Sequence, residues 1–447
     1  MPCAIMCIYG AKTVALSKTQ EASSIVEQEK QQTRFFPAPT REGALYILAL
    51  LLTLITRVAA LGRFALTSRE LQGSVAALSW LRGESLSGLT YSPLQWLLQV
   101  PLFALMRTSE FTARAPTALA AVALVLAIYA QRRVLGRMRA LCLTLLVTVS
   151  PTLLHYSRQA DGAYLAAAAA VVATLCGYRA MQPAVSGQKR TQDWCWFAVS
   201  VAVGLTAGQA FWTWLFAAAL LIWWRLGARR RVAGSTGTAV HASQPLLWGA
   251  AALVGISTAV LLHPAGFGAA LGLLADWGAA LAAPGRPWYW PLSCLALYEP
   301  LLVILGACGA ARAWRAHDRL GQFALLWFVV ALLFGLIGQR DGFWMPGIVA
   351  PLALLAADGV PVVWAALCAG RGRLSVVAGI GLAILLAFSA LSLLMYANSG
   401  QVSLAWLSGG AALVVCGLWV GLGVWEGWPT AQTVGWGLLL IILTMMT

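Results

Sequence analysis

A short polar segment between two apolar runs carries several side chains that could do chemistry. The segment reads LLHYSRQADGAY (residues 153–164) and contains His155, Tyr156, Arg158 and Asp161. Only 15 of the 447 residues are Asp or Glu, so an acid in such a tight turn requires a reason. Asp161 could act as a general base, and His155 as a base or ligand. Equally, Asp161 could pair with Arg158, and His155 could simply hydrogen-bond at the end of its helix.

A second acid, Glu70, opens the segment SRELQGSVAALSWLRG. Val75, Leu78 and Leu81 recur there at helical spacing, which predicts an amphipathic helix. Glu70 could be an N-terminal acid that the helix dipole favours, with Ser68 as the helix cap. It could also point into a cavity, where a carboxylate would serve as a base.

Further polar groups lie in the segments PGRPWYWPLSCLALYEP and IGQRDGFWMPG. Glu299 lies about two to three helical turns into an apolar segment, so it must be paired, solvated or protonated. We predict that it faces the protein interior with a polar or basic partner, or lines a cavity. Tyr289 lies between two tryptophans, as in the aromatic belt at a membrane interface. Arg340 could pair with Asp341 or bind a phosphate, which the guanidinium fork suits.

The elements that position these groups are predicted to be membrane-spanning helices. Hydrophobic residues make up 60% of the chain and charged residues 10%. Apolar runs of about 20 residues, enough to cross roughly 30 Å of hydrocarbon, recur along the sequence. The fold class is therefore all-α, a polytopic integral membrane protein with about 13 transmembrane helices. No P-loop, GxGxxG or HExxH motif occurs, which argues against nucleotide hydrolysis and Rossmann-type chemistry.

The net charge of +15 is explained by the rule that short cytoplasmic loops carry Lys and Arg, so we expect no nucleic-acid partner. With the N-terminus in the cytoplasm, the basic segments QRRVLGRMR, RLGARRRVAG and ARAWRAHDR all fall on the cytoplasmic side of the cell membrane. We divide the chain into a polar tail (1–43), a transmembrane core (44–370) and C-terminal transmembrane helices (371–447). The opposite side then receives six of the acids: Glu70, Glu84, Glu110, Asp161, Asp276 and Asp341.

The first outer loop is predicted to hold interfacial helices. Its first segment is the amphipathic helix that Glu70 opens. Its second, SPLQWLLQVPLFALMR, is apolar but short, and we expect Pro101 to break it. A comparable apolar segment, GFGAALGLLADWGAALAAPGRPWYW, follows the seventh span. Loops this apolar on one side suggest the roof of a cavity that opens towards lipid.

Taken in order, these motifs resemble the GT-C superfamily of polytopic glycosyltransferases. The resemblance covers about residues 44–365 and rests on WLRGE, YSPLQWLLQVPLFAL, SEFTARAPTALAAVALVLAIY, SPTLLHYSRQAD, RPWYWPLSCLALYEP and GQRDGFWMPGIVAPLALLAADG. It is strongest to the flippase-activity-associated putative glycosyltransferases, which are related to protein mannosyltransferases. Such enzymes take a sugar from a polyprenyl phosphate and transfer it in a cavity at the outer membrane face.

The resemblance also implies roles for individual residues. The family carries an Asp-Glu pair at the start of the first outer loop, where this chain has Arg69 and Glu70. Asp161 matches the second acid of the pattern, so Glu70 and Asp161 are the expected catalytic residues. They would also be the ligands of any divalent cation, the one cofactor we consider. The expected substrate-binding residues are Arg69, His155, Arg158, Tyr289, Glu299, Arg340 and Trp344.

Three functions compete. The leading one is transfer of a sugar from a polyprenyl-phosphate donor, with membrane lipid as the surrounding partner. The alternative is a catalytically silent relative that binds lipid or scaffolds a membrane complex, and Arg69 in the place of an acid is its best support. A secondary transporter ranks third, because the halves show no convincing repeat.

Overall fold

The computed structural model describes residues 41–84, 91–182, 187–229, 243–282, 285–338 and 342–368. The chain divides into two compact units, residues 1–48 and 49–447, and the candidate site lies wholly within the second. Most of the tail (1–40) and the predicted C-terminal helices (371–447) fall outside the described residues.

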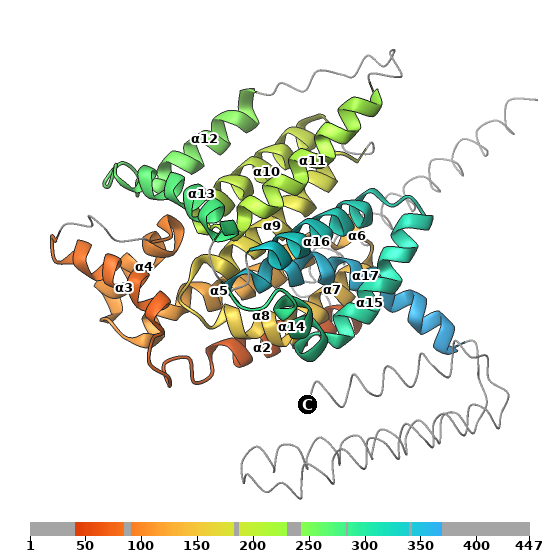
Figure 1. Cartoon of the computed structure of the whole chain (residues 1–447), viewed down its shortest axis with the longest axis horizontal. Coiled ribbons are helices and arrows are strands. Elements are labelled where there is room, and N and C mark those ends of the chain that lie inside the picture. Colours follow the sequence, from red (N-terminus) through yellow and green to blue (C-terminus); the bar gives the residue numbers. More distant parts are fainter. Residues whose placement is uncertain are drawn as a thin grey trace, which may run out of the picture. The chain divides into compact units, whose positions relative to one another are not determined.

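Helices build the described part of the chain (Figure 1). In order they are α2 (Arg41–Val58), α3 (Ser68–Leu81), α4 (Pro93–Met106), α5 (Glu110–Ala130), α6 (Arg132–Leu135), α7 (Arg137–Val149), α8 (Pro151–Ser157), α9 (Gly162–Ala180), α10 (Gly187–Ala207), α11 (Ala210–Arg229), α12 (Ser243–Ser257), α13 (Gly266–Ala282), α14 (Trp290–Tyr298), α15 (Pro300–Arg315), α16 (Arg319–Ile337), the 3₁₀ turn η1 (Gly342–Trp344) and α17 (Met345–Cys368). The all-α prediction is thus confirmed for the residues described.

Four stretches of this part are long and apolar enough to cross a membrane: Glu110–Ala130, Gly162–Ala180, Arg319–Ile337 and Gly342–Val363. Two bent helix pairs bring the number to as many as six: α7 with α8, and α14 with α15. The protein is therefore a multi-pass membrane protein. The count of about 13 spans stays a prediction.

The two predicted interfacial segments form helices of 14 residues each, α3 and α4. Thr67, and not the expected Ser68, caps α3: its hydroxyl accepts from the N–H of Glu70, and the Glu70 carboxylate accepts from the N–H of Thr67. Pro101 lies inside α4 without ending it, so the expectation of a broken segment was wrong. Loss of one backbone donor is not enough to stop a helix that packs on neighbours along its length.

The core forms around α9 and α17, whose small side chains let other backbones come close. Most of the alanine-rich α9 is buried, and it packs on α10. The helix α17 packs extensively on α15 and also contacts α16, α7 and α9. Figure 1 shows these segments side by side although they come from distant parts of the sequence.

Glu299 connects the bend between α7 and α8 with the bend between α14 and α15. The axes of α7 and α8 differ by 64°, and those of α14 and α15 by 96°; each bend precedes a proline, Pro151 or Pro300, that lacks a backbone donor. One oxygen of Glu299 accepts from the Ser150 hydroxyl at 2.5 Å and from the N–H of Thr152 at 2.8 Å. The prediction that Glu299 lies in the interior with a polar partner is confirmed, since the residue is fully buried.

Candidate functional site

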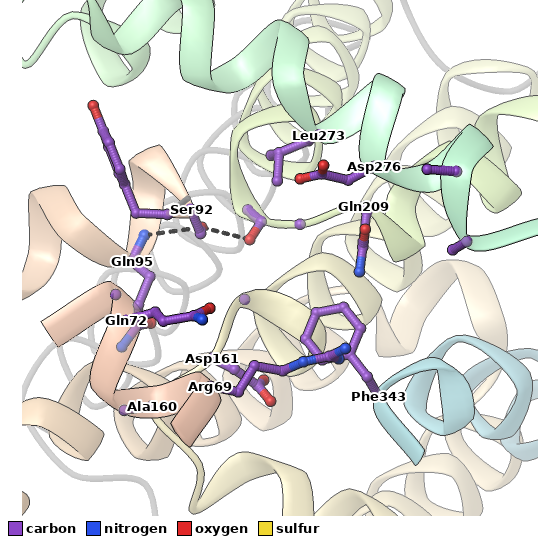
Figure 2. A pocket seen from close by; sticks show the side chains of 17 residues that line it. Arg69, Gln72, Ser92, Gln95, Ala160, Asp161, Gln209, Leu273, Asp276 and Phe343 are labelled. Carbon is purple, nitrogen blue, oxygen red and sulfur yellow. Dashed lines mark hydrogen bonds between the residues drawn. The ribbon is translucent and has the colours of Figure 1, made fainter. Parts of the chain in front are cut away.

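A cavity of about 380 Å³ opens between α3, α4, α13 and the turns that precede α9, α11 and α17. Figure 2 shows its polar side chains converging from these separate elements. The residues that matter for chemistry are Arg69, Gln72, Asp161, Gln209, Asp276 and Phe343.

Two glycines in contact bring the walls of the cavity together. A Cβ atom on Gly162 would lie 1.7 Å from the carbonyl oxygen of Ala207, and one on Gly208 would lie 2.9 Å from the carbonyl oxygen of Gly162. Only glycine allows the start of α9 and the turn before α11 to approach this closely. As a result Asp161 and Gln209, the neighbours of these glycines, share one cavity.

Asp161 caps the N-terminus of α9, just before that membrane span. Its Oδ1 accepts a hydrogen bond from the N–H of Ala163 at 3.0 Å. Burial raises the pKa of Asp161 to about 7, and the nearby negative charge of Glu70 adds to this rise. The N–H of Ala163 and the positive charge of Arg69 oppose the rise in pKa. A carboxyl group with a pKa near 7 can accept and release protons at neutral pH.

Arg69 lies beside Asp161 in the cavity (Figure 2). Its guanidinium carbon stands 4.5 Å from the centre of the Phe343 ring, a cation–π contact that holds the long side chain across the cavity. Arg69, which stands where the sequence resemblance led us to expect an acid, therefore places a positive charge in this cavity. A guanidinium in such a place suits the binding of a phosphate or a carboxylate.

Glu70 does not line the cavity, and its side chain is 1% exposed. Its Oε1 accepts from Arg114 Nε at 2.7 Å and from the N–H of Ala160 at 2.8 Å. Its Oε2 accepts from Arg114 Nη2 at 2.9 Å, and from the N–H and hydroxyl of Thr67 at 2.8 and 3.0 Å. Both carboxylate oxygens of Glu70 thus accept hydrogen bonds from the protein itself. One of the donors is the N–H of Ala160, the residue before Asp161.

These contacts argue against Glu70 as a base. Burial alone would raise its pKa, but the hydrogen bonds from Arg114, Thr67 and Ala160 outweigh burial and lower the pKa below its ordinary value. A carboxylate that is buried, saturated and weakly basic is poorly suited to take a proton from a substrate.

The residues present do not fit a divalent cation. Glu70 is fully engaged, and Asp161 has the positive charge of Arg69 beside it. No group of three His, Cys, Asp or Glu side chains in the described part of the chain could hold a metal ion.

Two predicted binding residues from the segment 153–164 lie elsewhere than in the cavity lining. Arg158 donates to the carbonyl oxygens of Thr56 and Ala59, at 2.8 Å each, and so caps the C-terminal end of α2. It makes no ion pair with Asp161, which was the alternative considered from the sequence. His155 is exposed, and its Nε2 hydrogen-bonds Gln159 Nε2 at 2.9 Å.

Tyr289 and Trp344 also lie outside the cavity lining. Tyr289 is exposed and packs edge-on against Trp288, as expected for an interfacial belt. Trp344 is buried in the main core, and its neighbour Phe343 takes the place in the cavity lining. Arg340 falls outside the described residues.

Sequence reasoning did not select Gln209, Asp276 or Phe343 for the site. Asp276 was visible as an acid within an apolar segment, which is a general sign of function in membrane proteins. Gln209 and Phe343 carried no local signal, because their role depends on contacts between distant segments.

Comparison with known proteins gives two kinds of likeness. Residues 92–261 match the family model described as dolichyl-phosphate-mannose-protein mannosyltransferase. Among solved structures, ArnT from Cupriavidus metallidurans bound to undecaprenyl phosphate is 16% identical with a TM-score of 0.56, over 91% of this chain and 75% of ArnT. No curated protein matches the sequence significantly.

The oligosaccharyltransferase of Archaeoglobus fulgidus in its apo form is similar over 73% of this chain, with 12% identity and a TM-score of 0.51. The archaeal oligosaccharyltransferase AglB from the same organism, in complex with an inhibitory peptide and a dolichol-phosphate, gives a TM-score of 0.50 at 12% identity. The chain spans about half the length of these archaeal proteins, 51% and 50%. At such low identities these likenesses describe the fold.

Proposed function

We propose that this chain is a membrane glycosyltransferase of the GT-C superfamily, related to protein mannosyltransferases, and that it transfers a sugar from a polyprenyl-phosphate donor. The acceptor is a hydroxyl group that enters the cavity shown in Figure 2. Polyprenyl phosphates in the structures of ArnT and AglB support a lipid-linked donor for this chain as well.

The observation that carries the proposal is that Asp161 and Arg69 line the same cavity. In the proposed reaction Asp161 takes the proton of the acceptor hydroxyl as the acceptor oxygen bonds to the anomeric carbon of the sugar. The bond from that carbon to the phosphate oxygen breaks, and the electron pair leaves with the polyprenyl phosphate. Arg69 stabilises the negative charge on the departing phosphate. In this reaction Asp161 is the only carboxyl group that takes part in proton transfer.

Glu70 is a positioning residue in this scheme. Its bond to the N–H of Ala160 fixes the residue next to Asp161, while Arg114 connects it to α5. Arg114 also donates to the carbonyl oxygens of Leu61 and Phe64, which holds the loop before α3. The network thereby sets the position of the turn that carries the base.

The first test is transfer by purified protein in lipid nanodiscs, with a radiolabelled polyprenyl-phosphate hexose as donor. Loss of a general base typically lowers the rate about 10²–10⁴-fold, so Asp161→Asn should reduce transfer or donor hydrolysis by that order. Glu84→Gln, which removes an exposed acid that does not line the cavity, is the matched control and should leave the rate unchanged.

Folding is checked by size-exclusion profile and thermal unfolding of each variant. If wild-type protein turns over no polyprenyl-phosphate sugar and Asp161→Asn behaves identically, the enzymatic proposal fails. The chain would then be a silent relative that binds lipid or scaffolds a complex, as Arg69 in the acid position suggests.

A further inference from the structure

Asp276 is the single charged residue of α13, whose sequence is GFGAALGLLADWGAALA. An acid within so apolar a helix of a membrane protein is costly and persists when it has a partner or a function. The side chain is half-buried and lines the cavity. Figure 2 shows it on the same side as Gln209, across the cavity from Arg69 and Asp161.

A tryptophan anchor fixes the position of Asp276 and Gln209 together. Trp277 Nε1 donates to Thr213 Oγ1 of α11 at 3.0 Å, and its ring packs edge-on against Phe334 at 5.3 Å between centroids. Successive residues of a helix point about 100° apart, so with Trp277 held against the bundle Asp276 turns to the cavity. Gln209 directly precedes α11, the helix that receives this hydrogen bond.

Within the described part of the chain, neither side chain has a hydrogen-bond partner. Across the described residues, no hydrogen bond or ion pair is made to the Asp276 carboxylate, and the Gln209 side chain has no hydrogen-bond partner either. A carboxylate only accepts hydrogen bonds, and an amide both accepts and donates. A ligand that satisfies both must therefore carry hydrogen-bond donors, which means hydroxyl groups or an ammonium group.

The cavity is thus divided by charge. Arg69 on one side suits an anion, and Asp276 with Gln209 on the other suits donors. A glycosyl phosphate has this division within one small molecule, with an anionic phosphate and a ring rich in donors. A volume of about 380 Å³ lies at the low end of small-molecule pockets, about 300–1,000 Å³, and is large enough for one sugar ring.

We propose that Asp276 and Gln209 form the sugar-recognition subsite, which binds the hydroxyl or amino groups of a single donor sugar while Arg69 holds its phosphate. This inference rests on the proposed function, because it takes the ligand to be a polyprenyl-phosphate sugar. It adds two specificity-determining residues to the proposed reaction.

The test measures binding, so that it can be read without turnover. Protein in nanodiscs is titrated with undecaprenyl phosphate, with an undecaprenyl-phosphate hexose and with an undecaprenyl-phosphate amino sugar. Wild type should bind at least one sugar lipid more tightly than bare undecaprenyl phosphate. Hydrogen bonds to a charged group contribute enough that Asp276→Asn should weaken binding of that sugar lipid roughly 10-fold. Gln209→Leu should weaken it less, and both should leave bare undecaprenyl phosphate unchanged.

Glu84→Gln, the exposed-acid control, should alter none of the three affinities. A larger loss for the amino sugar identifies an ammonium as the donor group, and a larger loss for the hexose identifies hydroxyls. The assignment is overturned if wild type binds the sugar lipids no more tightly than bare undecaprenyl phosphate, or if the variants weaken binding of bare undecaprenyl phosphate equally. It is also overturned if EDTA abolishes the tighter binding of the sugar lipid by wild type, because a bound cation, and not the two side chains, would then hold the sugar. Transfer measured on the same samples tests the proposed function separately. Turnover that is insensitive to Asp276→Asn rejects the subsite alone. Tighter binding of the sugar lipid without any turnover rejects transfer alone.

Discussion

At the scale of the residue, Asp161 is under opposing influences. Burial raises its pKa to about 7 and the charge of Glu70 adds to the rise, whereas Arg69 lowers the pKa. A base works as the carboxylate, so the transfer rate should increase with pH and level off above about pH 7.

Replacement of Arg69 gives the sharper form of this prediction. Arg69→Gln removes the positive charge that lowers the pKa of Asp161, so the rising part of the pH–rate profile should move to higher pH. Arg69→Lys keeps the charge and should restore the profile. A profile that stays in place in Arg69→Gln, measured with saturating donor, would show that the titrating group is not Asp161.

At the scale of the element, the Glu70–Arg114 pair connects α3 and α5 with the turn before α9. Breaking one partner of a buried ion pair costs about 3–5 kcal/mol, so Glu70→Gln should lower the free energy of unfolding by that order. Denaturation in detergent, compared with Glu84→Gln, measures the effect. A fully stable Glu70→Gln protein that has lost all transfer would instead make Glu70 the base, as the sequence first indicated.

The pH dependence of stability follows from the same pair. The pKa of Glu70 is lower in the folded protein than its ordinary value of 4.5. The folded state therefore binds fewer protons, and the stabilisation by Glu70 is present above about pH 4.5 and is lost as the pH falls through the folded pKa.

At the scale of the whole molecule, the sequence predicted the features that depend on composition and local pattern. Apolar spans were predicted from runs of apolar residues, and the burial of Glu299 from its place within an apolar segment. The N-terminal orientation and the count of 13 spans remain predictions from the basic loops. Asp161 was found because an acid in a tight apolar turn stands out locally.

Contacts between distant segments could not be read in this way. Nothing near Glu70 in sequence indicates that Arg114, 44 residues later, saturates its carboxylate. Nothing near Arg158 indicates that its donors cap α2, about 100 residues earlier. Gly162 and Gly208 each read as ordinary loop glycines until their close approach is seen. These long-range contacts form the site. The residues that line it therefore differ from those predicted from the sequence, whereas the fold class is as predicted.

The most direct test of the central claim is a cryo-EM structure of the protein in nanodiscs with a polyprenyl-phosphate sugar, using Asp161→Asn to slow turnover. Phosphate density is expected within hydrogen-bond distance, about 3 Å, of the Arg69 guanidinium. The sugar should extend towards Asp276 and Gln209, with its anomeric carbon facing residue 161. Phosphate density outside this cavity, with Arg69 and residue 161 free of ligand, would contradict the account.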